Sequence, residues 1–229
     1  MSKNRFPTNN QSFLSRHQFW WFLIAAIIIR QIPFISIPFN WLESYFHEIS
    51  HGMAALVSGG DIIRIQLFTN GAGLCTTQGG SRFLISFFGY GGAIIWGGLI
   101  YNLAGRRQRF AQAFSGFIAL LLLVSLLFWA RDLLTIVILL VLFIMFALTI
   151  KLQQLKFVQI LMQLFGLLVL LNSLFSPLYL LDGRDLGDGA TLSTMTYIPE
   201  LIWVLIWSGL ALFVLYLLSK NEQIKISYT

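Results

Sequence analysis

Long apolar runs, separated by short polar stretches, make up most of the chain. Since about 20 consecutive apolar residues span a bilayer, the runs predict membrane helices over residues 19–37, 41–58, 83–103, 110–129, 133–150, 157–176 and 201–218. The first run ends near Pro33 and Pro38. We therefore expect an all-α polytopic membrane protein with six or seven transmembrane helices. A single transmembrane domain over residues 19–218 would lie between a polar basic tail, residues 1–18, and a polar tail, residues 219–229.

Residues 61–80 depart from the apolar pattern. Apolar and polar side chains alternate from Ile63 to Leu67, which is the period of a β-strand, and Asn70-Gly71 follows. Asn-Gly between two such segments is the strongest short-range signal for a hairpin. We expect a small membrane-associated β-hairpin over about residues 61–80.

Composition supports an integral, multi-pass membrane protein, which we expect in the cell membrane. Hydrophobic residues make up 57% of the chain and charged residues only 10%, against about 25% charged in soluble domains. A net charge of +6 would suggest nucleic acid as a partner of a soluble protein. Here the cations lie at the ends of apolar runs, which indicates contact with the lipid bilayer and no nucleic acid. If seven spans cross the membrane in turn, the 15 cations are divided almost equally between its two sides. The number of cations therefore predicts no orientation of the protein.

The second predicted span, residues 41–58, is too polar to face lipid. Asn40 has the character of an N-cap, with Glu43 three residues later as in a capping box. The helix contains His47-Glu48-Ile49-Ser50-His51, the pattern H-E-x-x-H. Residues i and i+4 share a helix face, so both imidazoles could reach one zinc ion, while Glu48 lies ~100° round the helix as a candidate general base. The alternative is a structural histidine pair that is hydrogen-bonded between helices.

These residues resemble the site-2 protease family of intramembrane zinc metalloproteases, and more narrowly its compact bacterial branch. The resemblance covers about residues 40–207. It rests on H-E-I-S-H-G-M-A-A-L-V-S-G-G, on the hairpin ending G-L-C-T-T-Q-G-G, on F-G-Y-G-G, and on G-D-G-A-T-L-S-T-M-T-Y-I-P. The first motif is specific and the others are suggestive.

The resemblance implies an aspartate as the third zinc ligand, near the start of a later helix. Asp188 begins D-G-A-T-L, eleven residues before a proline, as in the compact branch. Asp182 is the alternative, because it lies in residues 177–183, which match P-x-x-x-L-D-G, although Leu174 stands where the broad family has asparagine. The blander interpretation of both is a solvated Asp/Gly turn. Four spans separate residues 41–58 from the loop 177–199, so both should end at one side of the membrane.

The implied function is hydrolysis of a peptide bond within or beside a transmembrane segment of a membrane protein substrate. His47, His51 and Asp188 (or Asp182) would hold Zn²⁺, and Glu48 would be catalytic. An unwound substrate could pair with the edge of residues 63–68. The alternative is a non-catalytic membrane scaffold or metal-binding protein that retains the protease fold. Nothing in the pattern indicates an oligomeric state.

Overall fold

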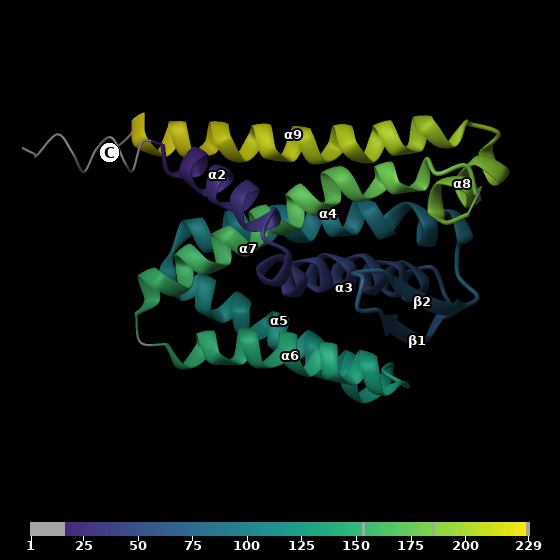
Figure 1. Ribbon diagram of the computed structural model, residues 1–229, viewed down its shortest axis with the longest axis horizontal. Helices are drawn as coiled ribbons and strands as arrows, with labels where there is room; N and C mark the ends of the chain where they lie inside the picture. Colours follow the sequence, from purple (N-terminus) through teal and green to yellow (C-terminus); the bar gives the residue numbers. More distant parts are fainter. Residues whose placement is uncertain (1–16, 153, 185, 228–229) are drawn as a thin grey trace, which may run out of the picture.

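The computed structural model describes residues 17–152, 154–184 and 186–227, so most of the predicted N-terminal tail lies outside the described residues. The chain is mostly helical with one small hairpin (Figure 1). Its elements are α2 (Gln18–Arg30), α3 (Pro33–Val57), β1 (Asp61–Leu67), β2 (Gly73–Gln78), α4 (Arg82–Arg106), α5 (Gln108–Phe128), α6 (Leu133–Lys151), α7 (Leu155–Phe175), the 3₁₀ helix η1 (Ser176–Leu180), α8 (Asp188–Thr196) and α9 (Glu200–Ser227).

The chain is a multi-pass membrane protein, as the composition predicts. Five helices in the described part are long and apolar enough to cross a bilayer, and α2 with α3 can form a sixth, broken span. The two are bent by 107° at their junction. Seven separate spans are therefore too many, because the first two predicted spans form one bent pair.

The predicted boundary between these two helices is wrong. The break comes at residues 31–32, where Pro33 occupies the start of α3, a position that needs no amide hydrogen. Pro38 lies inside α3, where it removes only one hydrogen bond close to the helix start. Asn40 and Glu43 are consequently interior residues of α3, and the predicted capping box does not form.

The bent pair places the start of α2 and the end of α9 at one face of the membrane. The Phe19 ring at the start of α2 contacts the Tyr101 ring near the end of α4, with centroids 5.8 Å apart. Figure 1 shows α2 beside the C-terminal part of α9, while the hairpin and α8 lie at the opposite end of the bundle. Four spans, α4 to α7, connect the end of α3 to α8, which returns the chain to the same face as predicted.

The hairpin forms where the alternation predicts it. β1 and β2 pair antiparallel, with Ile65 opposite Cys75 and a bulge between Ile62 and Arg64. The outer edge of β1 is already occupied: the Ile65 amide donates to the Trp129 carbonyl at 3.0 Å, and the Leu67 amide donates to Thr135 Oγ1 at 2.9 Å. Residues 63–68 therefore offer no free edge at these amides to a substrate strand. The other strand, β2, packs against α3.

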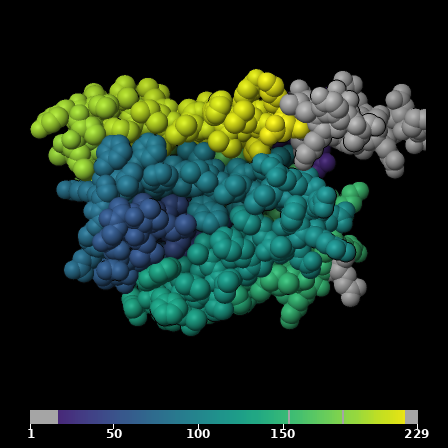
Figure 2. Space-filling model, turned by 180° about the vertical axis from the view of Figure 1, so that it is seen from behind, coloured from purple at the N-terminus to yellow at the C-terminus, as the bar shows by residue number. Residues whose placement is uncertain are grey.

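Close helix crossings hold the bundle around α4 and α7. Gly97 and Gly166 meet at this crossing, where a Cβ on Gly166 would lie 2.6 Å from the Tyr101 amide nitrogen. Small residues allow such approach between membrane helices, where packing replaces the hydrophobic effect as the driving force. Helix α9 lies along one long side of the molecule (Figure 2). Its Trp207 is fully buried.

Candidate metal centre

Helix α3 presents its two histidines to α4. The Nε2 atoms of His47 and His51, one turn apart, are separated by 2.9 Å. The two rings lie against Gly89, where a Cβ would come within 2.5 Å of Nε2 of His51 and 2.8 Å of Cε1 of His47. A side chain at position 89 would therefore displace the imidazoles.

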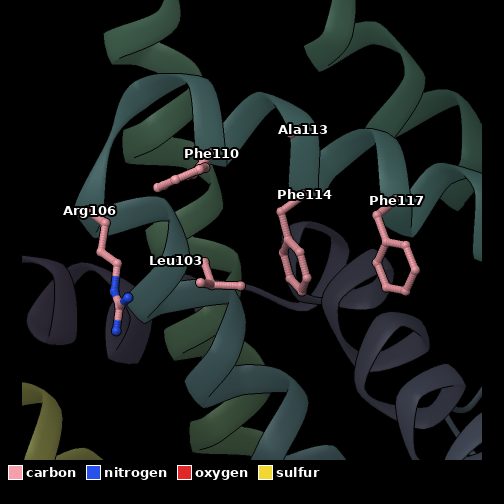
Figure 3. A pocket seen from close by; sticks show the side chains of 6 residues that line it. All are labelled: Leu103, Arg106, Phe110, Ala113, Phe114 and Phe117. Atoms are coloured by element: carbon pink, nitrogen blue, oxygen red, sulfur yellow. The ribbon is translucent and has the colours of Figure 1, made fainter.

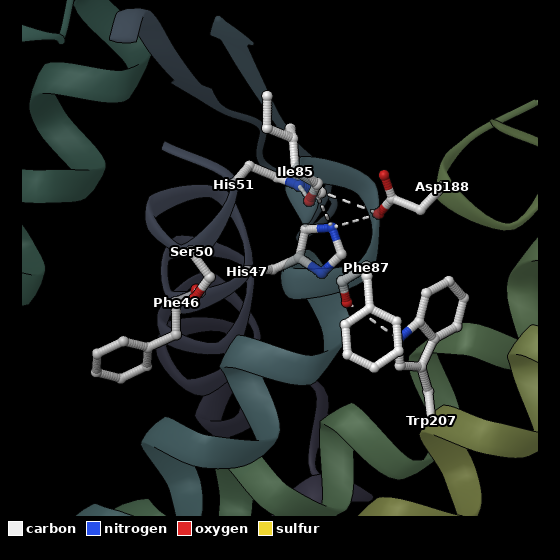
Figure 4. A network of polar contacts seen from close by, with 8 residues as sticks. All are labelled: Phe46, His47, Ser50, His51, Ile85, Phe87, Asp188 and Trp207. Carbon is white, nitrogen blue, oxygen red and sulfur yellow. Dashed lines mark hydrogen bonds and ion pairs between the residues drawn. The ribbon is translucent and has the colours of Figure 1, made fainter. Parts of the chain in front are cut away.

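Asp188 is distant from the two histidines in the sequence but lies next to them in the structure. Its Oδ2 atom lies 3.2 Å from Nε2 of His47 and 3.3 Å from Nε2 of His51, as Figure 4 shows. Asp188 is the first residue of α8, and Gly187 before it has φ +97°. That backbone conformation is almost confined to glycine, so Gly187 allows the chain to turn Asp188 toward the bundle.

The three side chains could hold a metal ion. Their ligand atoms all lie within 4.8 Å of one another, and the side chains are only 9–17% exposed. Tetrahedral ligands at about 2.0–2.1 Å from zinc are about 3.3 Å apart, which the observed separations approach. Two imidazole nitrogens and one carboxylate oxygen are also a donor set that suits zinc.

A backbone carbonyl of α4 fixes the tautomer of His51. Nδ1 of His51 lies 2.6 Å from the Ile85 carbonyl oxygen. Because a carbonyl only accepts, Nδ1 must carry the hydrogen, and Nε2 keeps its lone pair directed at the cluster. A hydrogen bond of this kind commonly orients a metal-binding histidine.

Glu48 lies on the side of α3 that faces the hairpin. Its carboxylate accepts a hydrogen bond from the Cys75 backbone amide of β2, and only 4% of the residue is exposed. Gly73 of β2 packs on the same side chain: a Cβ there would lie 2.5 Å from Cγ of Glu48 and 2.7 Å from Oγ of Ser44. The hairpin thus covers and fixes the residue predicted to be the general base.

Asp182, the alternative third ligand, lies elsewhere. It is exposed, and its Oδ2 accepts from Nε of Arg184 at 2.6 Å. This hydrogen bond lowers the pKa of the Asp182 carboxyl below its usual value. The structure brings Asp188 to the histidines and places Asp182 in a surface turn.

Several neighbours of the site were not predictable from motifs. The Tyr90 ring packs edge-on against His47, with centroids 4.3 Å apart, and in a tilted arrangement against Trp207, with centroids 4.9 Å apart. Trp207 Nε1 also donates to the Phe87 carbonyl of α4 at 3.1 Å, which fastens α9 beside the site (Figure 4). These aromatic residues form one wall of the histidine cluster.

A partly buried chain of polar side chains links α2, α7 and α3. Arg30 Nε donates to Asn172 Oδ1 at 2.9 Å, and Asn172 Nδ2 donates to Asn40 Oδ1 at 3.0 Å. Glu43 is hydrogen-bonded to Ser176 rather than to a histidine. Asn172 thus joins α2, α7 and α3, although position 174, where the family resemblance implies asparagine, is leucine.

The comparison with protein families agrees with this geometry. The Peptidase M50B-like family matches residues 20–218, which include α3, the hairpin and α8. No curated protein and no solved structure matches the chain. The match extends over most of the chain and contains His47, Glu48, His51 and Asp188. On this ground, the chain belongs to the Peptidase M50B-like family.

Proposed function

We propose that the protein is a zinc-dependent intramembrane endopeptidase that hydrolyses a peptide bond within or beside a transmembrane segment of a protein substrate. The observation that carries the proposal is the convergence of His47, His51 and Asp188, whose ligand atoms lie within 4.8 Å of one another. Membership of a peptidase family supports it. The location of the cluster within a bundle of membrane helices supports a substrate that also lies in the bilayer.

His47, His51 and Asp188 would hold the ion, which when bound would polarise the scissile carbonyl and lower the pKa of water. Glu48 would accept a proton from the attacking water and deliver it to the nitrogen of the leaving amine. The Cys75 amide holds the Glu48 carboxylate in position for this transfer. The Ile85 carbonyl keeps His51 in the tautomer that binds metal through Nε2.

The substrate must open its own helix before it can react. A membrane helix keeps its carbonyls in its hydrogen-bond ladder, and each unpaired backbone group in hydrocarbon costs several kcal/mol. Segments with glycine or proline near the cut site should therefore be cleaved faster than uniformly leucine-rich spans.

Metal analysis of the purified full-length protein, combined with cleavage of a membrane-spanning reporter peptide, tests the proposal. The wild type should hold about one zinc per chain and cleave the reporter. His47→Ala and His51→Ala should lose both properties, while Glu48→Gln should keep the metal and lose cleavage. His17→Ala is the matched control, because His17 lies outside the cluster.

Two results would reject the proposal. Equal zinc content in the wild type and both histidine variants would remove the metal assignment. Zinc binding by a wild-type protein that cleaves no membrane peptide, with or without helix-breaking residues, would instead favour a non-catalytic metal-binding protein that retains the fold.

A further inference from the structure

An apolar groove lies between α4 and α5, at the end of the bundle opposite the metal centre. Its volume is about 310 Å³. Figure 3 shows its lining: Leu103 and Arg106 from α4, and Phe110, Ala113, Phe114 and Phe117 from α5. Arg106 is the only charged residue in this lining.

Three phenylalanines form a ladder along the groove. Phe110, Phe114 and Phe117 stand at i, i+4 and i+7 on one face of α5, a rise of about 10 Å along the helix axis. Phe110 is 49% exposed and Phe117 47% exposed, while Phe114 is partly buried against the core, so the two ends of the ladder face outward from the bundle. The small side chain of Ala113 leaves the groove open between the rings. The shape is that of a trough for a linear apolar chain.

The mouth of the groove is strongly basic. Arg106 ends α4 and is followed by Arg107 and Arg109 at the start of α5. All three are exposed, and none forms an ion pair with another residue whose side chain the structure describes. Guanidinium groups hydrogen-bond phosphate oxygens in pairs, so the mouth complements a phosphate at the membrane surface.

The whole membrane face around the mouth is cation-rich. Exposed cations at this face are Arg106, Arg107, Arg109, Lys151, Lys156 and Lys220. Acidic residues with described side chains gather toward the opposite face or inside the bundle: Glu43, Glu48, Asp61, Asp132, Asp182, Asp188 and Glu200. The opposite face carries the exposed cations Arg64, Arg82, Arg131 and Arg184. The excess of basic residues, six against four among those described, favours the groove face as the cytoplasmic one. Cytoplasmic leaflets are also the ones that carry anionic lipids.

We propose that this groove binds one anionic phospholipid, with its phosphate against Arg106 and an acyl chain along the Phe110–Phe114–Phe117 ladder. The basic mouth favours an anionic headgroup. The apolar groove favours a lipid, which has an acyl chain to fill it, over a free phosphate. The site is independent of the proposed proteolysis, because Arg106 is 17 residues beyond Gly89 on α4, about 25 Å along the helix.

Native mass spectrometry of the delipidated full-length protein tests this assignment. Dioleoyl phosphatidylglycerol and dioleoyl phosphatidylcholine are added separately at equal concentration, and the fraction with one bound lipid is measured. The wild type should retain phosphatidylglycerol about fivefold better than phosphatidylcholine, which is the preference expected from one basic residue near an anionic headgroup. Arg106→Gln should abolish the preference, and Ala113→Leu should reduce retention of both lipids by filling the trough.

Lys220→Gln is the matched control, because it removes the same charge at the same face outside the groove. It should leave the preference unchanged, and the metal content of every variant should equal that of the wild type. Equal losses in Arg106→Gln and Lys220→Gln would overturn the proposal by showing only a general surface charge effect. Unchanged retention in Ala113→Leu, or a protein dimer that Ala113→Leu abolishes, would overturn the acyl-chain assignment.

Discussion

The Cys75 backbone amide donates a hydrogen bond to the Glu48 carboxylate, so a strand of the hairpin holds the candidate general base of the metal centre. Gly73, two residues earlier, is packed so closely that a Cβ there would lie 2.5 Å from Cγ of Glu48. Gly73→Ala must therefore displace either the carboxylate or the strand. We expect cleavage to fall by about 100-fold, the cost of a 1 Å misplacement of a catalytic group, while zinc content is unchanged.

Gly209→Ala is the control for this substitution, because a Cβ at position 209 meets nothing within 4 Å. It should cleave at the wild-type rate. Wild-type cleavage by Gly73→Ala would show that the position of β2 does not matter to Glu48.

Asp188→Ala should weaken zinc binding strongly, and Asp182→Ala should not. Asp188 lies within 3.3 Å of both histidines, whereas Asp182 is exposed and pairs with Arg184. An exposed ion pair adds little to stability, so Asp182→Ala should also unfold at nearly the wild-type temperature. Zinc affinities of the two variants decide the matter, and the reverse order would return the third-ligand role to Asp182.

Gly89→Ala should impair the metal centre without removing a ligand. The added methyl group would overlap the His51 ring, 2.5 Å from Nε2, and would force the imidazole off its hydrogen bond to the Ile85 carbonyl. Loss of such an orienting bond typically lowers metal affinity about 10–100-fold. Competition with a chelator measures the affinity. Gly116→Ala, whose Cβ has an ordinary contact at 3.7 Å, should bind zinc as the wild type does.

The pH dependence of alkylation at Cys75 should show whether the hairpin is packed against α3. Burial, and then the charge of Glu48, raise the pKa of the Cys75 thiol to about 12. Because the thiolate is the reactive form, alkylation by iodoacetamide should be slow at pH 8 and should rise about tenfold per pH unit up to pH 10. Loss of the hairpin contacts would expose the thiol and lower its pKa toward its ordinary value.

A reference thiol makes this measurement interpretable. Thr194 is exposed on α8, so Thr194→Cys in a Cys75→Ser background should react faster and level off above about pH 9.5, as an ordinary thiol does. A Cys75 rate that levels off at the same pH would contradict the packing of β2 on α3.

Local sequence patterns were enough to predict the histidine pair, the hairpin and the return of the chain to one membrane face. The i, i+4 spacing fixes a shared helix face whatever surrounds it, and Asn70-Gly71 marks the turn of the hairpin. Both depend only on residues close together in the chain. The parity of the spans depends only on counting the apolar runs after α3.

Features that depend on distant residues were not predictable in this way. Pro33 and Pro38 are both possible helix breakers; in the structure the break precedes Pro33, and the separated α2 packs against α7. The Cys75 amide that binds Glu48 and the Ile85 carbonyl that binds His51 are backbone groups. Every residue except proline has both groups, so the sequence gives no sign of these two contacts. The sequence shows that Asn172 is polar, but it does not predict its hydrogen-bond partners, Arg30 and Asn40, because they lie in other helices.

The distance in sequence between the histidine pair and Asp188 also affects how the protein is made. Helix α3 is synthesised early, whereas α8 follows only after α4, α5, α6 and α7 have been made. A ribosome-bound chain that has inserted α3 carries His47 and His51 without Asp188, which joins them only when α8 packs beside α4. The three-residue cluster is thus incomplete until Asp188 is translated, about five-sixths of the way through the matched segment, residues 20–218. Newly inserted membrane proteins nearby would therefore meet the complete His47–His51–Asp188 cluster only after this chain has folded.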